Sequence, residues 1–360
     1  MKFAVIEYIS KTGAIWKHTA ERPNYLCDPQ TEMDPTSFGC YVSALEGEHI
    51  PIKALIHPTI VKRVYRKLLG RWPRYNISYL KNFDVLLIVH QISDGHEVTR
   101  LTKRIRQEMP HIKIIGVPTQ PYGILKSYWE NHPDWLADFR EFMDSCHIFA
   151  TIVESTRDTW QQLTKTPVHY IPQPYPVTYT KQFFLPHKSK KPIIFVAGRT
   201  DRDNIAKGLL VAKELQKEFT SFDIHITDIP DPDVNFDTTN LKGARFEFQP
   251  FRNWKEHLEY LQYVTLVVNT DYTHTRGRVQ ADCAAVGTPS IGANSDAQKD
   301  MFPELPANEN QSIADLVTQG KKLIEEPAFY ASVAQTAHTR LQEYSYEKSA
   351  KRIHDLIKRL

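Results

Sequence analysis

The chain has 360 residues, of which 41% are hydrophobic and 24% are charged, and its formal net charge is only +3. This composition is typical of a globular protein, and the length suits two domains better than one. No apolar run approaches the ~20 residues that a membrane-spanning helix needs. The first residues, MKFAVIEYI, predict a buried strand rather than a signal peptide. The four cysteines lack the paired spacing of a metal site, so we expect reduced thiols in a cytoplasmic protein.

Short apolar runs alternate with helical patterns in the first half of the chain. This alternation favours βαβ units around a parallel sheet. The predicted strands are residues 2–8, 50–55, 84–90, 112–117, 148–153 and 168–171. The predicted helices are residues 37–47, 58–70, 96–109, 122–131, 134–144 and 156–164.

One stretch of this half is strongly basic, because residues 49–83 contain no acidic side chain. Its cations are Lys53, Lys62, Arg63, Arg66, Lys67, Arg71, Arg74 and Lys81. A helix over 58–70 would have one apolar and one cationic face. Residues 58–74 are then either a solvated surface or a contact with an anionic membrane surface or a nucleic acid.

The second half repeats the alternation after a Pro-rich and then basic stretch, residues 172–192, which is typical of a linker. Its predicted strands are residues 193–197, 223–227, 245–248, 264–268 and 289–291. Its predicted helices are residues 205–219, 254–262, 277–286, 311–325, 327–343 and 346–359. Two α/β halves of similar size predict two doubly wound domains.

Four short motifs of the second half lie at strand ends and helix ends. In chain order they are Gly198-Arg199, Lys207-Gly208, the segment from His274 to Gly277, and Gly287-Thr288-Pro289. This order resembles the C-terminal domain of GT-B glycosyltransferases, especially their family 4-like group (glycosyl transferases group 1). The N-terminal half and the C-terminal end of the chain are also similar to that group, at residues 38–51, 81–84, 168–174 and 344–348.

The resemblance implies an α/β fold of the GT-B type, with two Rossmann-like doubly wound domains facing across a cleft. Residues 1–180 would bind the acceptor, residues 181–343 the nucleotide sugar, and residues 344–360 would form a helix that crosses back to the first domain. The implied activity is transfer of a hexose-like sugar from a UDP- or GDP-sugar to a glycan, a lipid-linked or a small-molecule acceptor. It implies no cofactor and no metal, and a cytoplasmic location or one peripheral to the inner face of a membrane.

Donor binding is assigned residue by residue from the same resemblance. Arg199 and Lys207 match the pair whose side chains bind the donor diphosphate, and Arg202 in the intervening loop competes for that role. Cations and helix N-termini suit this position because the diphosphate gains charge as it departs. Gly13 follows the first strand, where such folds pass a loop under the donor.

The family's second motif has two glutamates eight positions apart, which contact the donor sugar and the ribose. Here His274 takes the first position, a departure from the pattern, and Asp282 takes the second and keeps a carboxylate for the ribose hydroxyls. Arg276 and Arg278 are additional cations that suit a phosphate. Gly277 would let a helix N-terminus approach the donor closely.

Acceptor activation is expected from His90, Asp94 and His96, which follow the strand at 84–90. The histidine that many relatives place in the segment 118–120 is absent. The resemblance favours retention of the anomeric configuration, but the altered glutamate pair leaves retention or inversion open. Two alternatives also stay open. The basic segment suits a phage-type DNA-base glucosyltransferase. The missing glutamate and histidine suit a catalytically silent GT-B module that binds a nucleotide sugar or a partner.

Overall fold

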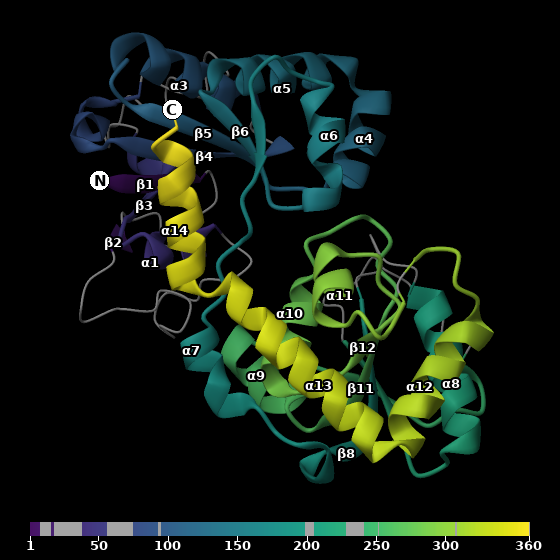
Figure 1. The fold of residues 1–360 in the computed structure, drawn as a ribbon. Coiled ribbons are helices and arrows are strands. Elements are labelled where there is room, and N and C mark those ends of the chain that lie inside the picture. The colour runs from purple at the N-terminus through teal and green to yellow at the C-terminus, as the bar shows by residue number, and fades with distance from the viewer. Residues whose placement is uncertain are drawn as a thin grey trace. The chain divides into compact units, whose positions relative to one another are not determined.

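The computed structural model describes residues 1–7, 16–17, 38–55, 75–92, 95–198, 205–227, 241–250, 252–306 and 308–359. The chain forms two compact units (Figure 1): unit 1 is residues 1–174 with 346–360, and unit 2 is residues 175–345. The basic segment 58–74 and the candidate residues Gly13, Asp94, Arg199 and Arg202 lie outside the described residues.

Unit 1 contains a seven-stranded sheet in the order β2-β3-β1-β4-β5-β6-β7. Six strands are parallel: β1 (Phe3–Glu7), β3 (Glu48–Pro51), β4 (Val85–His90), β5 (Lys113–Pro118), β6 (Ile148–Thr151) and β7 (Val168–Tyr170). At the edge, β2 (Trp16–Lys17) runs antiparallel to β3. Because β1 pairs with both β3 and β4, the strand order reverses between β1 and β4. Ligands of such sheets bind outside the carboxyl ends of the strands at this reversal.

The helices of unit 1 pack around this sheet (Figure 1). They are α1 (Gly39–Ala44), α3 (Gly95–Glu108), α4 (Tyr122–Asn131), α5 (Pro133–Ser145), α6 (Arg157–Gln161) and α14 (Tyr346–Ile357), with 3-10 turns at Ile52–Leu55, Ser78–Asn82 and Glu154–Thr156. Trp160 lies at the centre of an aromatic core, with Phe139 and Phe149 at ring-centroid distances of 5.6 and 5.4 Å. Its indole N–H donates to Thr156 (3.1 Å), so its one polar group is satisfied although it is buried.

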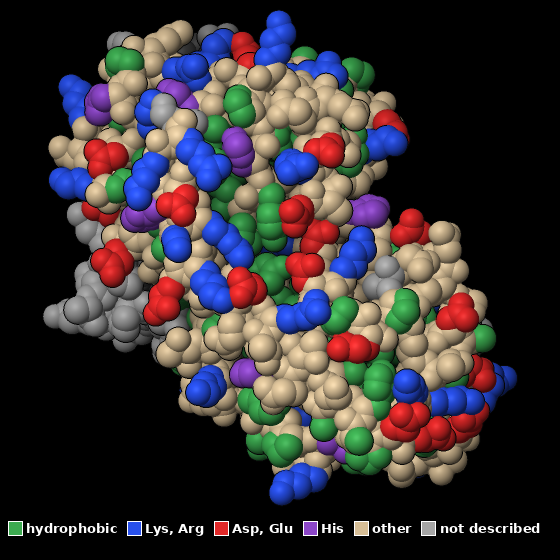
Figure 2. Space-filling view, viewed as in Figure 1, with side chains coloured by type: hydrophobic (Ala, Val, Ile, Leu, Met, Phe, Trp, Pro, Cys, Tyr) green, Lys and Arg blue, Asp and Glu red, His purple; other side chains and the backbone are tan. Residues whose placement is uncertain are grey.

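Helix α14 is amphipathic. Ser349 and Ile353 are buried, whereas Lys348, Lys351 and Arg352 are exposed. Figure 2 shows Lys and Arg side chains along this helix. No helix among the described residues combines the length and the apolar character needed to cross a membrane.

Unit 2 contains a five-stranded parallel sheet in the order β10-β9-β8-β11-β12. Its strands are β8 (Lys191–Ala197), β9 (Asp223–Thr227), β10 (Phe246–Gln249), β11 (Val264–Asn269) and β12 (Ser290–Ile291). Its helices are α7 (Val177–Thr180), α8 (Ile205–Glu218), α9 (Trp254–Leu261), α10 (Arg278–Val286), α11 (Asp296–Met301), α12 (Ile313–Glu325) and α13 (Pro327–Leu341), with 3-10 turns at Lys181–Phe183, His187–Ser189 and Gln342–Tyr344. Because β8 pairs with both β9 and β11, the order reverses between β8 and β11.

The prediction of two doubly wound α/β halves is confirmed by these two sheets. One local prediction was wrong: the strand expected over 50–55 ends at Pro51, where a 3-10 turn begins. The segment expected as a linker, 172–192, contains the boundary between the two units after Pro174. From Tyr175 onward it forms α7 and two 3-10 turns that belong to unit 2.

That segment is held because its polar groups find partners in unit 2. The N–H of Leu185 donates to the carbonyl of Val286 (3.2 Å). The ammonium of Lys190 donates to Gln262 O, Val286 O and Thr288 Oγ1 at 2.8–2.9 Å. These hydrogen bonds therefore fix the Pro-rich segment within unit 2.

Candidate functional site

In unit 2, the ends of the two strands at the reversal are tied together by Asn269. Its side-chain amide donates to the carbonyl of Ala197 at the end of β8 (3.0 Å). Its side-chain oxygen accepts from Gln280 of α10 (3.3 Å). One buried amide therefore fixes the ends of β8 and β11 relative to α10, at the edge where such sheets bind ligands.

Gly277, which is buried, precedes α10 at that edge. This glycine has φ of +84°, a conformation that L side chains rarely adopt, and a Cβ there would lie 2.8 Å from Ala297 Cβ. No side chain caps the helix among the described residues. The helix dipole favours an anion at this end. Arg276 and Arg278 flank Gly277 in the chain, and the guanidinium of Arg278 pairs with the carboxylate of Asp282 (3.4 Å).

Lys207 lies in the first turn of α8, at the same edge of the sheet. Its ammonium donates to the carbonyls of Gln311 and Glu309, the second at 3.4 Å, and lies 5.0 Å from the ring centroid of Tyr272. An ammonium has three donors, and these two carbonyls use two of them. Two carbonyls thus hold the lysine in place at this edge.

The loop after β11 carries His274, which is exposed and has φ of +55°. Its N–H donates to the side-chain oxygen of Asn294 (3.3 Å), and the amide nitrogen of Asn294 donates to Tyr272 O (3.2 Å) and Glu309 (3.3 Å). Left-handed backbone at a residue other than glycine is uncommon and concentrates at functional sites. His274 therefore presents its side chain from a loop whose shape Asn294 maintains.

Asp282 is only 3% exposed. One carboxylate oxygen accepts from Tyr175 Oη (2.7 Å) and Trp254 Nε1 (3.0 Å), and the other lies 3.4 Å from Arg278 Nε. Burial first, and then the charge of Asp282, raise the pKa of Tyr175 well above its usual value, so the tyrosine stays a hydrogen-bond donor. Both oxygens thus contact side chains of unit 2. The sequence did not reveal these partners, and ribose recognition by Asp282 stays a prediction.

In unit 1, the strand at the reversal ends with His90. This side chain is 4% exposed and packs against Phe139 and Phe142 at ring-centroid distances of 4.6 and 4.8 Å. Burial lowers the pKa of His90, which favours the neutral ring. On neighbouring α3, His96 Nδ1 lies 2.8 Å from the Asp138 carboxylate of α5. The sequence predicted both histidines but missed Asp138, since it lies in a helix with no motif.

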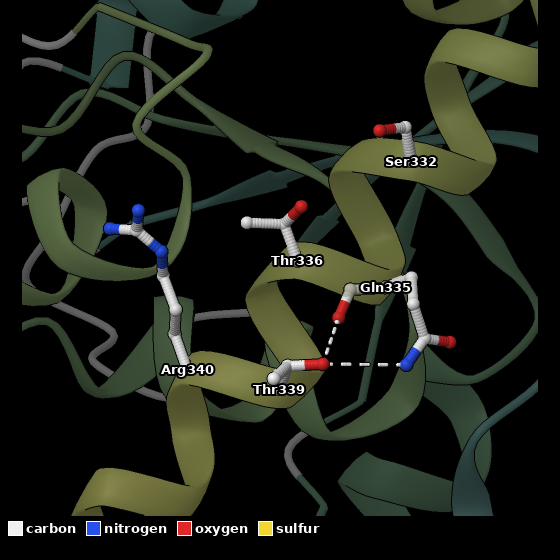
Figure 3. A pocket seen from close by; sticks show the side chains of 5 residues that line it. All are labelled: Ser332, Gln335, Thr336, Thr339 and Arg340. Atoms are coloured by element: carbon white, nitrogen blue, oxygen red, sulfur yellow. Dashed lines mark hydrogen bonds between the residues drawn. The ribbon is translucent and has the colours of Figure 1, made fainter.

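A separate cavity of about 350 Å³ lies on α13, and Figure 3 shows its lining side chains. They are Ser332, Gln335, Thr336, Thr339 and Arg340, and none of them is a residue predicted for the site. Arg340 donates to the carbonyl of Asp300 (2.8 Å). Hydroxyls and an engaged arginine provide no acid or base, so we do not include this cavity in the candidate site. Within the described ranges, no three His, Cys, Asp or Glu side chains converge as metal ligands would.

No family model matches the chain, and neither does any curated protein. Solved structures do match it. Sucrose-phosphate synthase from Thermosynechococcus elongatus is 12% identical with a TM-score of 0.66, and the match covers 99% of this chain and 98% of that one. A glycosyltransferase from Rickettsia africae is 11% identical with a TM-score of 0.61, with 99% and 98% covered. A TarM variant from S. aureus, in complex with fondaparinux, alpha-GlcNAc-glycerol and UDP, is 14% identical with a TM-score of 0.53, with 72% and 58% covered.

At these identities the likeness establishes the fold. The chain has the GT-B glycosyltransferase fold with two Rossmann-like domains, as its sequence predicted.

Proposed function

We propose that this chain is a glycosyltransferase that moves a sugar from a nucleoside diphosphate sugar to an acceptor hydroxyl. One observation carries the proposal. At the strand reversal of unit 2, Lys207 and the uncapped N-terminus of α10 lie at one edge of the sheet, with Arg276 and Arg278 beside that helix end. A diphosphate is the ligand that such an edge suits.

The chemistry follows from the charge that develops during transfer. When the bond between the sugar and the diphosphate breaks, the diphosphate leaves with the electron pair and its negative charge grows. Fixed N–H groups and cations stabilise that charge without a bound metal. Each charge-assisted contact contributes about 1.5–3 kcal/mol. Arg199 and Arg202 belong to the same proposal from the sequence alone, and His274 is proposed to lie beside the sugar or the diphosphate.

The test is nucleotide binding by the full chain. UDP and GDP are titrated by calorimetry against the wild type and Lys207→Ala, and thermal shifts are recorded with their sugars. We expect at least one diphosphate to bind and Lys207→Ala to weaken it by about 10-fold or more, the equivalent of ~1.4 kcal/mol. Lys217→Ala is the matched control, since it removes an exposed lysine from the same helix. Absence of binding to either nucleotide, or equal dissociation constants for wild type and Lys207→Ala, would contradict the proposal.

A second candidate function is favoured by the contacts of Asp282. Its carboxylate is committed to Tyr175, Trp254 and Arg278, and His274 replaces an acidic residue at the paired position. Such a chain could bind a nucleotide sugar without transferring the sugar. Release of UDP from UDP-glucose, or GDP from GDP-mannose, with water as the acceptor separates the two functions, because a silent module binds without release.

A further inference from the structure

Helices α4 and α5 of unit 1 form a tight hairpin (Figure 1), in which only His132 separates Asn131, the last residue of α4, from Pro133, the first residue of α5. A proline has no backbone N–H to donate and its ring clashes with the preceding turn of a helix, so α4 ends before Pro133 and α5 begins on it. His132 therefore lies at the tip of the hairpin, where it is exposed.

Three aromatic rings gather at this tip. The ring of His132 stacks on that of Trp135, with 4.1 Å between the ring centroids and 16° between the planes, and the ring of Tyr128 lies 6.2 Å from that of Trp135. Backbone hydrogen bonds connect the same three residues: His132 N donates to Tyr128 O, and Trp135 N donates to His132 O, both at 3.0 Å. The hairpin therefore holds the rings in place before any ligand arrives, which reduces the entropy that binding would lose.

The core of unit 1 does not account for these rings. On its buried side, α4 uses Trp129, whose ring lies 5.2 Å from that of Phe139 and 6.1 Å from that of Trp160. Trp135 is only partly buried where it packs against this core, and Tyr128 is 45% exposed. No hydrogen bond joins the indole N–H of Trp135 or the hydroxyl of Tyr128 to any described residue. Aromatic surface and two polar groups are thus left for a ligand.

The charges around the rings disfavour an anionic ligand. The charged residues of the hairpin segment 122–136 are Lys126, Glu130 and Asp134, one cation against two anions, so its net charge is −1 with His132 neutral. All three charged side chains are exposed. Nucleic acids and anionic membranes bind where cations are in excess. The composition of this surface therefore favours a ligand without charge.

An uncharged saccharide suits both the rings and the charges. One face of a pyranose ring carries C–H groups, which the negative π-face of an aromatic ring attracts, and the rim of the sugar carries hydroxyls. The exposed carboxylates of Glu130 and Asp134 can accept hydrogen bonds from such hydroxyls, and the indole N–H of Trp135 can donate one. Aromatic surface with hydrogen-bonding groups at its edge is therefore the chemistry that a neutral sugar requires.

We propose that Tyr128, His132 and Trp135 form a binding surface on unit 1 for an uncharged glycan. The two exposed rings, Tyr128 and His132, stack on pyranose faces, while Trp135 contacts both rings and holds them in place. Glu130 and Asp134 accept hydrogen bonds from sugar hydroxyls at the rim. The inference goes beyond the proposed function, because binding at this surface requires neither a nucleotide nor transfer of a sugar.

The first test is affinity electrophoresis of the full chain, without nucleotide, in gels that contain a neutral polysaccharide: glycogen, laminarin, mannan or hydroxyethyl cellulose. Heparin and poly(dT) are the anionic comparison. We expect at least one neutral polysaccharide to retard the protein. Tyr128→Ala should weaken that binding by about 10-fold, because one stacked ring is lost, and Tyr128→Phe should retain most of it. Tyr263→Ala is the matched control, since Tyr263 of unit 2 is 40% exposed and lies outside the surface.

The second test locates the bound saccharide. Oligosaccharides cut from the polysaccharide that retards the protein are titrated into the ¹⁵N-labelled full chain, and the indole N–H signals are recorded. The signal of Trp135, assigned with Trp135→Phe, should shift in the wild type and in Tyr263→Ala. In Tyr128→Ala the same shift should require about 10-fold more saccharide. An unchanged Trp135 signal at saturating saccharide would place the binding elsewhere and overturn the inference.

The remaining outcomes also decide, and they do so independently of the nucleotide site. Retardation by none of the neutral polysaccharides, or equal binding by the wild type and Tyr128→Ala, overturns the inference. Retardation only by heparin or poly(dT) overturns it in favour of an anionic partner. A chain that binds UDP or GDP but no glycan keeps the proposed function and loses this surface, whereas a chain that binds glycan but no nucleotide keeps the surface and loses the proposed function.

Discussion

Asp282→Asn distinguishes a carboxylate that recognises ribose from one that holds unit 2 together. The substitution keeps the shape of the side chain and one oxygen acceptor but removes the charge. In the structure, that charge receives two hydrogen bonds from Tyr175 and Trp254 and pairs with Arg278, whose side chain is 18% exposed. We therefore expect the main effect on the stability of unit 2.

The magnitude follows from these contacts. A hydrogen bond to a charged group contributes about 1.5–3 kcal/mol and one between neutral groups about 0.5–1.5 kcal/mol, so the two bonds together lose roughly 2 kcal/mol. The largely buried Arg278 also loses its carboxylate, which adds about 1 kcal/mol after allowance for its partial exposure. The total of about 3 kcal/mol corresponds to a fall of roughly 6–12 °C in the melting temperature of a domain of this size.

Differential scanning calorimetry and UDP titration of the same variant decide between the two roles. Asp223→Asn is the matched control, because it alters an exposed Asp–Arg pair of unit 2 and should cost no more than about 1 kcal/mol. A melting temperature within a degree of the wild type would refute the structural reasoning. If the temperature held while UDP affinity fell, Asp282 would be a ribose ligand, as its position in the motif predicts.

Three further predictions concern single residues. Gly277→Ala should destabilise unit 2 by about 1–3 kcal/mol in urea unfolding and should also weaken nucleotide binding. The positive φ at this position is unfavourable for alanine, and the added Cβ would clash with Ala297. Equal urea midpoints for the variant and the wild type would contradict this prediction. Burial lowers the pKa of His147 from 6.5 to about 4 while its Nδ1 accepts from the N–H of Ile114 (3.0 Å). As the pH falls, the His147 ring therefore takes up a proton in the unfolded chain before it does so in the folded chain. The free energy of unfolding thus decreases as the pH falls from 6.5 towards 4. His147→Asn should reduce this decrease when urea unfolding is measured across the same pH range. Lys190→Met should lower the free energy of unfolding by about 2–4 kcal/mol, because Gln262 O, Val286 O and Thr288 Oγ1, all at partly buried positions, each lose one hydrogen bond. A stability change below about 0.5 kcal/mol would show that solvent replaces the ammonium.

The sequence predicted those features of unit 2 that depend on local rules. A glycine before a helix and a glycine after it bound α10 at Arg278 and Val286, and both glycines adopt positive φ. Apolar runs located β8 and β11 because these strands are largely buried, whereas β10 was located although Phe246 and Phe248 are exposed. Helix α11 was missed: it has only six residues, too few for a periodic pattern, although Ser295 caps it as a serine at that position would be expected to.

Contacts between distant residues could not be read from the same rules. Asp138 belongs to a helix whose sequence gives only an amphipathic pattern, and its approach to His96 depends on how α5 packs against α3. Tyr175 and Asp282 are 107 residues apart, and the tyrosine lies in the segment that its prolines marked as a linker. Side-chain partners of this kind are set by tertiary packing, to which neither hydrophobic periodicity nor motif spacing is sensitive.

Nucleotide binding and sugar transfer are separate properties of the proposed function, and that separation determines how the activity should be measured. In unit 2, Lys207 and the N-terminus of α10 are proposed to bind a diphosphate, while Asp282 directs its carboxylate to Tyr175, Trp254 and Arg278. Nucleotide affinity alone therefore does not distinguish an enzyme from a silent module, whereas release of the nucleotide from its sugar does.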